Sequence, residues 1–198
     1  WKPKTRAVYT RSINQPIVAS KILGHYKNIQ YGYLGAIDQN SIIIVPFKDF
    51  GDTSDNLGKS ITNIFRGKYI IKNGSYLGSI LSDKRYKDGS GTLGGIDGIF
   101  RFNDNLKLDW QLLLSKTNEP NDTTLSSNIN GYTFDNGSYS SDFDKETYGG
   151  HGLYLSLESE KRNNSMTLMY AERSSAFRAD NGYIDFNDRQ SLQKIEGL

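Results

Sequence analysis

The clearest pattern in the chain is the alternation of apolar and polar side chains over residues 106–115. Leu106, Leu108, Trp110, Leu112 and Leu114 are large and apolar, and the positions between them are polar in all but one case. Because successive side chains of a strand point to opposite faces, this pattern predicts a strand with one apolar face and one polar face. Its length exceeds that of most strands in globular proteins and suits a tilted strand that crosses a bilayer.

The same alternation recurs along the chain. It predicts about ten strands, at residues 5–13, 17–26, 29–38, 61–72, 76–84, 92–102, 106–115, 149–160, 165–173 and 183–194. Short turns at 27–28, 73–75, 103–105 and 162–164 alternate with longer connections at 39–60, 85–91, 116–148 and 174–182. The connection at 116–148 shows no apolar period, and compact soluble domains rarely contain a structureless loop of that length.

Outer-membrane barrels have short periplasmic turns and long outer loops in this order. The sequence therefore predicts an all-β fold, an antiparallel up-and-down transmembrane β-barrel. About ten of its strands are present, as part of a larger barrel. Residues 1–198 are interpreted as one incomplete barrel segment, with a soluble domain expected upstream and further strands downstream.

The free-energy cost of placing a charge in lipid indicates which face of each strand points to the lipid and which to the lumen. A Lys or Arg side chain that faces lipid near the bilayer centre costs about 2–4 kcal/mol. Charged strand residues are therefore expected to face the lumen. These candidate lumen residues are Arg66, Lys68, Lys72, Asp97, Arg101, Lys107, Asp109 and Glu158. Their mixed signs predict cross-strand ion pairs rather than a channel of one charge. Aromatic residues near the predicted strand ends, such as Tyr26, Tyr31, Tyr69, Tyr76 and Phe102, are candidates for an interfacial girdle.

Composition narrows the picture. The chain is 36% hydrophobic and its longest apolar run, residues 42–47, contains Pro46, so no helical membrane span is predicted. A net charge of +2, with acidic and basic residues interspersed, gives no reason to expect nucleic acid as a partner. The absence of cysteine excludes disulfides and thiolate metal sites.

Several segments resemble one family of large bacterial outer-membrane proteins. These segments are Val8-Tyr9-Thr10-Arg11-Ser12-Ile13 with Pro16-Ile17 and Lys21-Ile22-Leu23-Gly24, then Gly94-Gly95-Ile96-Asp97-Gly98-Ile99-Phe100-Arg101-Phe102, and finally Phe177-Arg178-Ala179-Asp180-Asn181-Gly182-Tyr183-Ile184. Members of that family carry an N-terminal domain similar to carbohydrate-binding module family 9, followed by a β-barrel of uncharacterised function. The resemblance implies such a domain before Trp1 and more strands after Leu198. It departs at Ser12, where a second Arg is expected, and at Asp185-Phe186, where a proline is expected.

The resulting hypothesis is a non-enzymatic outer-membrane β-barrel, part of a larger bacterial surface protein that acts as a channel, a scaffold or a polysaccharide-handling component. The expected partners are outer-membrane lipid, with polysaccharide and other outer-membrane proteins as further candidates. Tyr132, Tyr139 and Tyr148 are candidate loop contacts for a sugar, because aromatic rings beside polar groups suit flat, hydrated ligands. No catalytic residue, metal ligand or cofactor is predicted.

Two alternatives stay open. A soluble secreted β-sandwich that binds or hydrolyses glycans shares much of the pattern, and hydrolysis needs two carboxylates across a cleft. Asp97, Asp109 and Glu158 are the strand acids available for that role. The acidic run at residues 142–146 offers oxygen ligands for Ca²⁺, but it lacks the glycine and the spacing of an EF-hand loop, which favours a solvated acidic loop.

Overall fold

The computed structural model describes residues 5–9, 12–46, 51–54, 57–129, 131–184 and 186–197. Nine long strands form the body of the fold. They are β1 (Pro16–Tyr26), β2 (Ile29–Asp38), β5 (Ser60–Ile70), β6 (Tyr76–Tyr86), β7 (Gly89–Asn103), β8 (Leu106–Asn118), β11 (Thr147–Lys161), β12 (Asn164–Arg173) and β13 (Arg189–Gly197). The shorter elements are β3 (Ile43–Pro46), β4 (Gly51–Ser54), β9 (Thr133–Phe134), β10 (Tyr139–Ser140) and the 3₁₀ turns η2 (Lys72–Gly74) and η3 (Thr123–Ser126).

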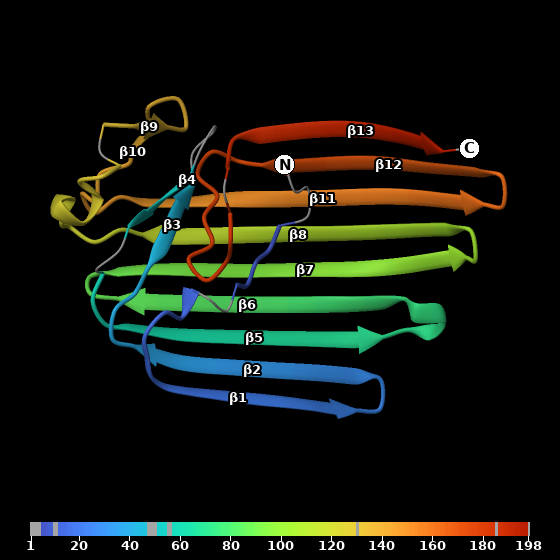
Figure 1. Cartoon of the computed structure of the whole chain (residues 1–198), viewed down its shortest axis with the longest axis horizontal. Coiled ribbons are helices and arrows are strands. Elements are labelled where there is room, and N and C mark those ends of the chain that lie inside the picture. Colours follow the sequence, from blue (N-terminus) through green and yellow to red (C-terminus); the bar gives the residue numbers. More distant parts are fainter. Residues whose placement is uncertain are drawn as a thin grey trace.

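The nine long strands form one antiparallel sheet in the order β1-β2-β5-β6-β7-β8-β11-β12-β13, in which each strand follows its predecessor along the chain (Figure 1). The prediction of an all-β, antiparallel, up-and-down fold is therefore confirmed. The sheet is not closed, since β1 and β13 form its two edges. No helix among the described residues is both long and apolar enough to span a membrane.

The short and the long connections lie at opposite ends of the strands (Figure 1). The tight turns that follow β1, β5, β7 and β11 lie at the right-hand end of the strands in that view, which we call the tight-turn end. The longer connections that follow β2, β8 and β12 lie at the left-hand end, the long-connection end. Lys27 and Asn73 adopt positive φ values of 52° and 60° in two of the tight turns. The longer connection predicted at 85–91 is wrong: β6 and β7 are joined by Lys87 and Asp88 alone, and Asp88 adopts a φ of 59°.

Most predicted strands match observed ones within a few residues, but the two ends of the chain differ. The described residues of the predicted strand 5–13, which are 5–9 and 12–13, do not join the sheet, and their backbone forms one β-bridge, between Arg6 and Tyr183. The last strand lies at β13 rather than at 183–194. Residues 10–11 and 185 of these predicted strands lie outside the described residues. β5 ends at Ile70, so Lys72 lies in the η2 turn and not on a strand face.

The connection between β8 and β11 is folded, contrary to the expectation of a structureless loop. It contains η3 and the β9–β10 hairpin, and it buries Ile129 and Phe143 completely. These two side chains pack with Ile43 and Val45 of β3 and with Leu57. The apolar residues of this small core are irregularly spaced in the sequence, which is why no periodic pattern announced it.

The sheet has an apolar face that is exposed and a polar face that is partly covered. We call the first the outer face. Its large apolar side chains, each between 36% and 60% exposed, are Ile29, Tyr31, Tyr33, Ile37, Ile61, Phe65, Tyr69, Leu77, Leu81, Ile96, Leu114, Leu155, Met166 and Leu168. The strand register places them on one side, for example in the adjacent positions Tyr33, Phe65 and Leu81. The separation weakens at the sheet edges, where Leu23 and Ile195 are exposed on the opposite side.

The opposite, inner face buries polar side chains such as Thr62, Ser82, Lys84, Thr117 and Ser156. Two segments cover part of it: residues 174–184, which we call the inner strap, and residues 5–9.

Both segments pack on the central strands. Phe177, Ala179 and Ile184 of the strap and Ala7 form an apolar cluster with Leu93 and Leu113. This cluster sits on the inner face of β7 and β8.

Hydrogen bonds also hold the inner strap and residues 5–9 in place on the sheet. Asn181 Nδ2 donates to Ser82 Oγ at 2.9 Å, and Thr62 Oγ1 donates to Asn181 Oδ1 at 3.2 Å. The backbone N–H of Thr5 donates to Gln111 Oε1 at 3.1 Å, and that of Tyr9 donates to the Asn181 carbonyl at 2.7 Å. Asn181 of the strap thus provides partners for the buried Thr62 and Ser82 of the inner face, as burial requires.

Close approach of the strap depends on a glycine of β11. A Cβ at Gly150 would overlap the backbone of Phe177, whereas a Cβ at Gly94, on the outer face, would meet nothing within 4 Å. We expect Gly150→Ala to destabilise the protein by about 1–3 kcal/mol, because overpacking forces backbone shifts. Gly94→Ala, the matched control, should leave the urea midpoint unchanged or raise it slightly. Equal midpoints for the two variants would contradict the packing of strap on sheet.

Candidate functional site

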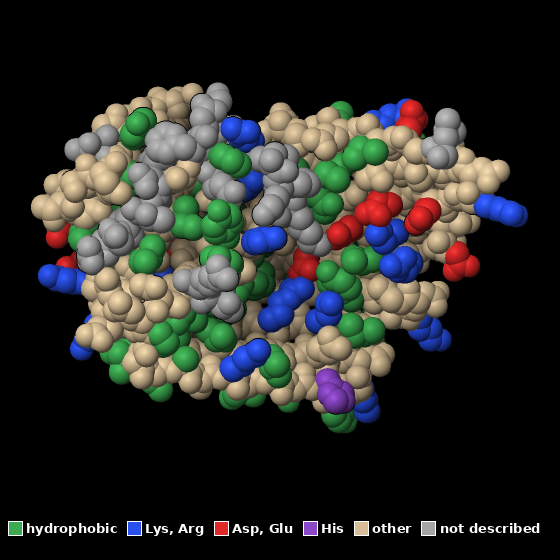
Figure 2. All heavy atoms as spheres, in the orientation of Figure 1, with side chains coloured by type: hydrophobic (Ala, Val, Ile, Leu, Met, Phe, Trp, Pro, Cys, Tyr) green, Lys and Arg blue, Asp and Glu red, His purple; other side chains and the backbone are tan. Residues whose placement is uncertain are grey.

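The inner face carries a set of charged side chains beside the strap, toward the tight-turn end of the strands. Figure 2 shows this face, with acidic and basic side chains gathered over its right-hand half. Arg66 of β5 pairs with Asp97 of β7 through two hydrogen bonds of 2.6 and 2.8 Å. The pair reaches across β6 at Gly78, where any Cβ would overlap both side chains. Bidentate pairs of this kind have fixed geometry and are among the stronger charged contacts.

Neighbouring groups extend this arrangement along the sheet. The Tyr76 hydroxyl donates to Asp97 Oδ2 at 3.0 Å, and Lys68 Nζ lies 3.8 Å from the centre of the Tyr76 ring. Lys107 of β8 and Glu158 of β11 are cross-strand partners 2.7 Å apart. The inner face therefore presents paired charges of both signs, as the mixed signs in the sequence predicted.

Seven of the eight candidate lumen residues lie at inner-face positions of the strand register. They are Arg66, Lys68, Asp97, Arg101, Lys107, Asp109 and Glu158, and Lys72 is the exception, in the η2 turn. The described strands form an open sheet, so a closed lumen around these residues belongs to the prediction and not to the observed fold.

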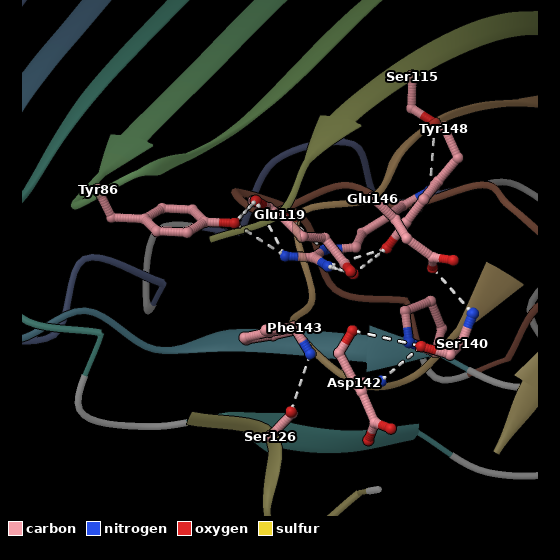
Figure 3. Close-up of polar contacts among 12 residues, drawn as sticks. Tyr86, Ser115, Glu119, Ser126, Ser140, Asp142, Phe143, Glu146 and Tyr148 are labelled. Atoms are coloured by element: carbon pink, nitrogen blue, oxygen red, sulfur yellow. Dashed lines mark hydrogen bonds and ion pairs between the residues drawn. The ribbon is translucent and has the colours of Figure 1, made fainter. Parts of the chain in front are cut away.

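A second cluster lies at the other end of the inner face, where the strap meets the long connections (Figure 3). Arg178 of the strap is its centre, with a side chain only 2% exposed. Its Nε donates to Asp180 Oδ1 at 2.6 Å, and its Nη2 donates to the Tyr86 hydroxyl at 3.0 Å. Its Nη1 donates to the Tyr148 hydroxyl at 3.1 Å and to Glu119 Oε1 at 3.3 Å.

This set of residues, the Arg178 cluster, ties together three parts of the chain. Tyr86 and Tyr148 belong to β6 and β11, Glu119 follows β8 directly, and Asp180 is in the strap. The Tyr148 hydroxyl donates to Glu119 Oε1 at 2.6 Å, which completes the network between the sheet and the connection. Removal of one partner from a buried charged network is costly, because the remaining charge is left uncompensated.

Burial and nearby charges perturb the ionisation of Glu119. The pKa of Glu119 is raised from the ordinary 4.5 to about 7. Desolvation is the main cause of this rise, and the nearby Glu146 and Asp144 contribute to it. Arg178 and the hydrogen bond from Tyr148 act in the opposite direction. Desolvation lowers the pKa of the Arg178 guanidinium, but the surrounding groups, Asp180 foremost, hold it well above the ordinary value.

The residues that could hold a cation lie next to this cluster. One carboxylate oxygen from each of Glu119, Asp144 and Glu146 lies within 4.8 Å of the others. Glu119 is buried, Glu146 half-buried and Asp144 exposed.

The three candidate loop tyrosines lie in different surroundings. Tyr148 is buried in the Arg178 cluster, so its ring is not open to a ligand from solvent. Tyr139 packs 5.2 Å from Tyr148 and 5.6 Å from Phe134, centre to centre. Tyr132 is 48% exposed and is the member of the set with an accessible ring.

Sequence reasoning did not assign roles to Arg178, Asp180, Glu119 or Tyr86. The segment 177–184 stood out through its family resemblance, but that resemblance supplied no contacts. The sequence does contain a signal for this cluster, because Arg178 and Asp180 alternate with the apolar Phe177 and Ala179. If such a segment is buried, its charged side chains need partners.

Comparisons with protein-family models, curated proteins and solved structures found no match to this chain. The family resemblance described above therefore stays a prediction.

The raised pKa of Glu119 leads to a testable pH dependence. The folded chain holds this proton more tightly than the unfolded chain, so stability should fall as pH rises from about 4.5 to about 7. Glu119→Gln removes the titrating group and should flatten that part of the profile. The measurement is the urea midpoint across this pH range for both proteins. A parallel profile in the variant would show that other groups cause the dependence.

Proposed function

We propose that the sheet is part of a transmembrane β-barrel of a bacterial outer membrane, with its outer face in lipid and its inner face toward an enclosed interior. The observation that carries this proposal is the inverted polarity of the sheet. Large apolar side chains are exposed across β2 to β12, while polar side chains such as Thr62, Ser82 and Lys84 are buried on the opposite face. Soluble monomers rarely expose apolar patches larger than a few hundred Å².

Strand length supports the same arrangement. β2, β5, β6, β7, β8, β11 and β12 are between 10 and 15 residues long, and a tilted strand needs about 9–11 to cross the hydrocarbon core.

Three charged residues of β6 and β8 point to the outer face near the long-connection end of the strands. They are Asp83, Arg85 and Lys116. Glu172, near the end of β12, bonds to His151 and Tyr170. All four charged residues lie near the ends of their strands on the long-connection side, and the mid-strand positions of the outer face carry large apolar side chains such as Phe65, Leu81 and Ile96.

Exposed aromatic residues fit an interfacial girdle in part. Tyr26, Tyr69 and Phe102 are 65%, 50% and 63% exposed and lie close to the tight turns. Tyr76 departs from the prediction, because its register places it on the inner face and its hydroxyl binds Asp97.

The alternative, a soluble glycan-binding or glycan-hydrolysing β-sandwich, requires a second sheet packed on the apolar face. Among the described residues, the small β3–β4 sheet instead packs near Tyr86, an inner-face residue. The exposure of the outer apolar side chains therefore favours the barrel.

Within a barrel, the inner charges and the strap suit a non-enzymatic channel, scaffold or polysaccharide-handling component of a larger surface protein. Outer-membrane lipid is the first partner, and polysaccharide and other outer-membrane proteins are further candidates. The upstream carbohydrate-binding-like domain and downstream strands implied by the family resemblance belong to the same proposal.

Arginine scanning on one strand tests the facing of the sheet. Leu168 of β12 is 43% exposed on the outer face, and Thr167 beside it points inward opposite Glu158. Leu168→Arg, and likewise Leu81→Arg on β6, should lower folding stability in lipid vesicles by about 2–4 kcal/mol at bilayer depth. Thr167→Arg is the control, and its new charge can pair with Glu158.

A water-exposed outer face gives a different result. Surface substitutions usually change stability by less than about 0.5 kcal/mol, so Leu81→Arg and Leu168→Arg would then be silent. Folding of the parent without detergent or lipid, together with silent variants, would refute the membrane proposal. The readouts are the denaturant midpoint and the gel mobility of unboiled against boiled samples.

A further inference from the structure

Three carboxylates meet at the base of the β8–β11 connection. Glu119 directly follows β8, Glu146 directly precedes β11, and Asp144 lies just before Glu146. The Glu119 N–H donates to the Glu146 carbonyl at 2.9 Å, and Asn121 and Asp144 form a β-bridge. The backbone therefore holds the two ends of the connection side by side, and it brings one oxygen of each carboxylate within 4.8 Å of the others.

The local cation does not balance these charges. Arg178 is the cation that contacts Glu119, and it is already shared with Asp180, to which it is bound more closely. Among the described residues, the Glu146 side chain accepts a hydrogen bond from the Ser140 N–H to Oε2 at 2.9 Å. Like charges at this separation repel one another, and a bound proton or a bound cation can relieve the repulsion.

An unsatisfied buried oxygen points to the cation. The side chain of Glu119 is only 1% exposed, and its Oε1 accepts from Tyr148 and Arg178. Its Oε2 is buried and has no hydrogen-bond partner among the described residues. A buried carboxylate oxygen without a partner is costly, and metal coordination is one of the ways in which proteins satisfy it.

We infer that Glu119, Asp144 and Glu146 form a Ca²⁺ site that clamps the two ends of the β8–β11 connection. Ca²⁺ takes six to eight oxygen ligands in flexible geometry, and carboxylates and water are its usual ligands. Glu119 Oε2 supplies the buried ligand, Glu146 the second, and Asp144 the third at the solvent side, where water completes the shell. An all-oxygen set without His or Cys favours Ca²⁺ over zinc or copper.

The site has a structural consequence for the Arg178 cluster. With Ca²⁺ bound through Oε2, Glu119 stays ionised and keeps both Tyr148 and Arg178 on Oε1. The cation therefore links the connection to the inner strap through one carboxylate. This inference does not depend on a membrane location, because the three carboxylates lie outside the long strands.

Terbium luminescence tests the site directly on the folded chain, because Tb³⁺ replaces Ca²⁺ at oxygen sites and Tyr148 lies beside Glu119 as a sensitiser. We expect saturable Tb³⁺ emission that Ca²⁺ displaces, and a Ca²⁺-dependent rise in the urea midpoint. Asp144→Asn and Glu146→Gln should each weaken Ca²⁺ binding at least about tenfold. Asp135→Asn removes an exposed carboxylate from the same connection outside the cluster and should bind as the parent does.

Two results would overturn the inference. One is the absence of saturable binding up to about 10 mM Ca²⁺, above the range of weak extracellular calcium sites. The other is unchanged affinity in both Asp144→Asn and Glu146→Gln. Asp144 is exposed, so its replacement removes a ligand without a change in packing, and circular dichroism checks that the strands are retained.

Discussion

Alternation of side chains across an extended backbone is the constraint on which the rest of this structure depends. A strand has only two faces, so each ladder of the sheet must sort its residues into two sets. Here the sorting is inverted relative to a soluble protein, because large apolar side chains are exposed on one face and polar side chains are buried on the other, where the strap covers it. A one-residue slip of any central strand would exchange the two sets. The register and the environment of each face are therefore fixed together.

The covered polar face creates a second requirement, which the inner strap meets. Buried hydroxyl, amide and charged groups need partners, and the strap supplies them through Asn181 and Arg178. Phe177 adds apolar contact with Leu93 and Leu113 where the inner face is itself apolar. Beyond the strap, Arg66 pairs with Asp97 across β6, and Lys107 pairs with Glu158. The inner face is thus divided between a packed half and a charged half.

The sequence predicted those parts of the fold that follow a period. β2 and β8 were located because their alternation is nearly unbroken, and the facing of Arg66 and Asp97 followed from the same parity. The prediction of a sheet strand at 5–13 was wrong, because the described residues 5–9 pair with the strap, through Arg6 and Tyr9, and not with the sheet. The Arg178 cluster could not be predicted, since Tyr86, Glu119 and Tyr148 come from separate elements whose proximity only the sheet register decides. The small core around Phe143 was missed because its residues have no period.

The central claim is that the outer face contacts acyl chains, and Trp110 on that face provides the most direct measurement. The chain has two tryptophans, so Trp1→Phe leaves Trp110 as the single reporter. Its ring packs against Phe100, with centroids 6.3 Å apart, on the outer side of β7 and β8. With the protein folded into vesicles, bromine atoms on the lipid acyl chains should quench Trp110 fluorescence strongly and aqueous iodide should not. Strong quenching by iodide with no effect of brominated lipid would contradict the account.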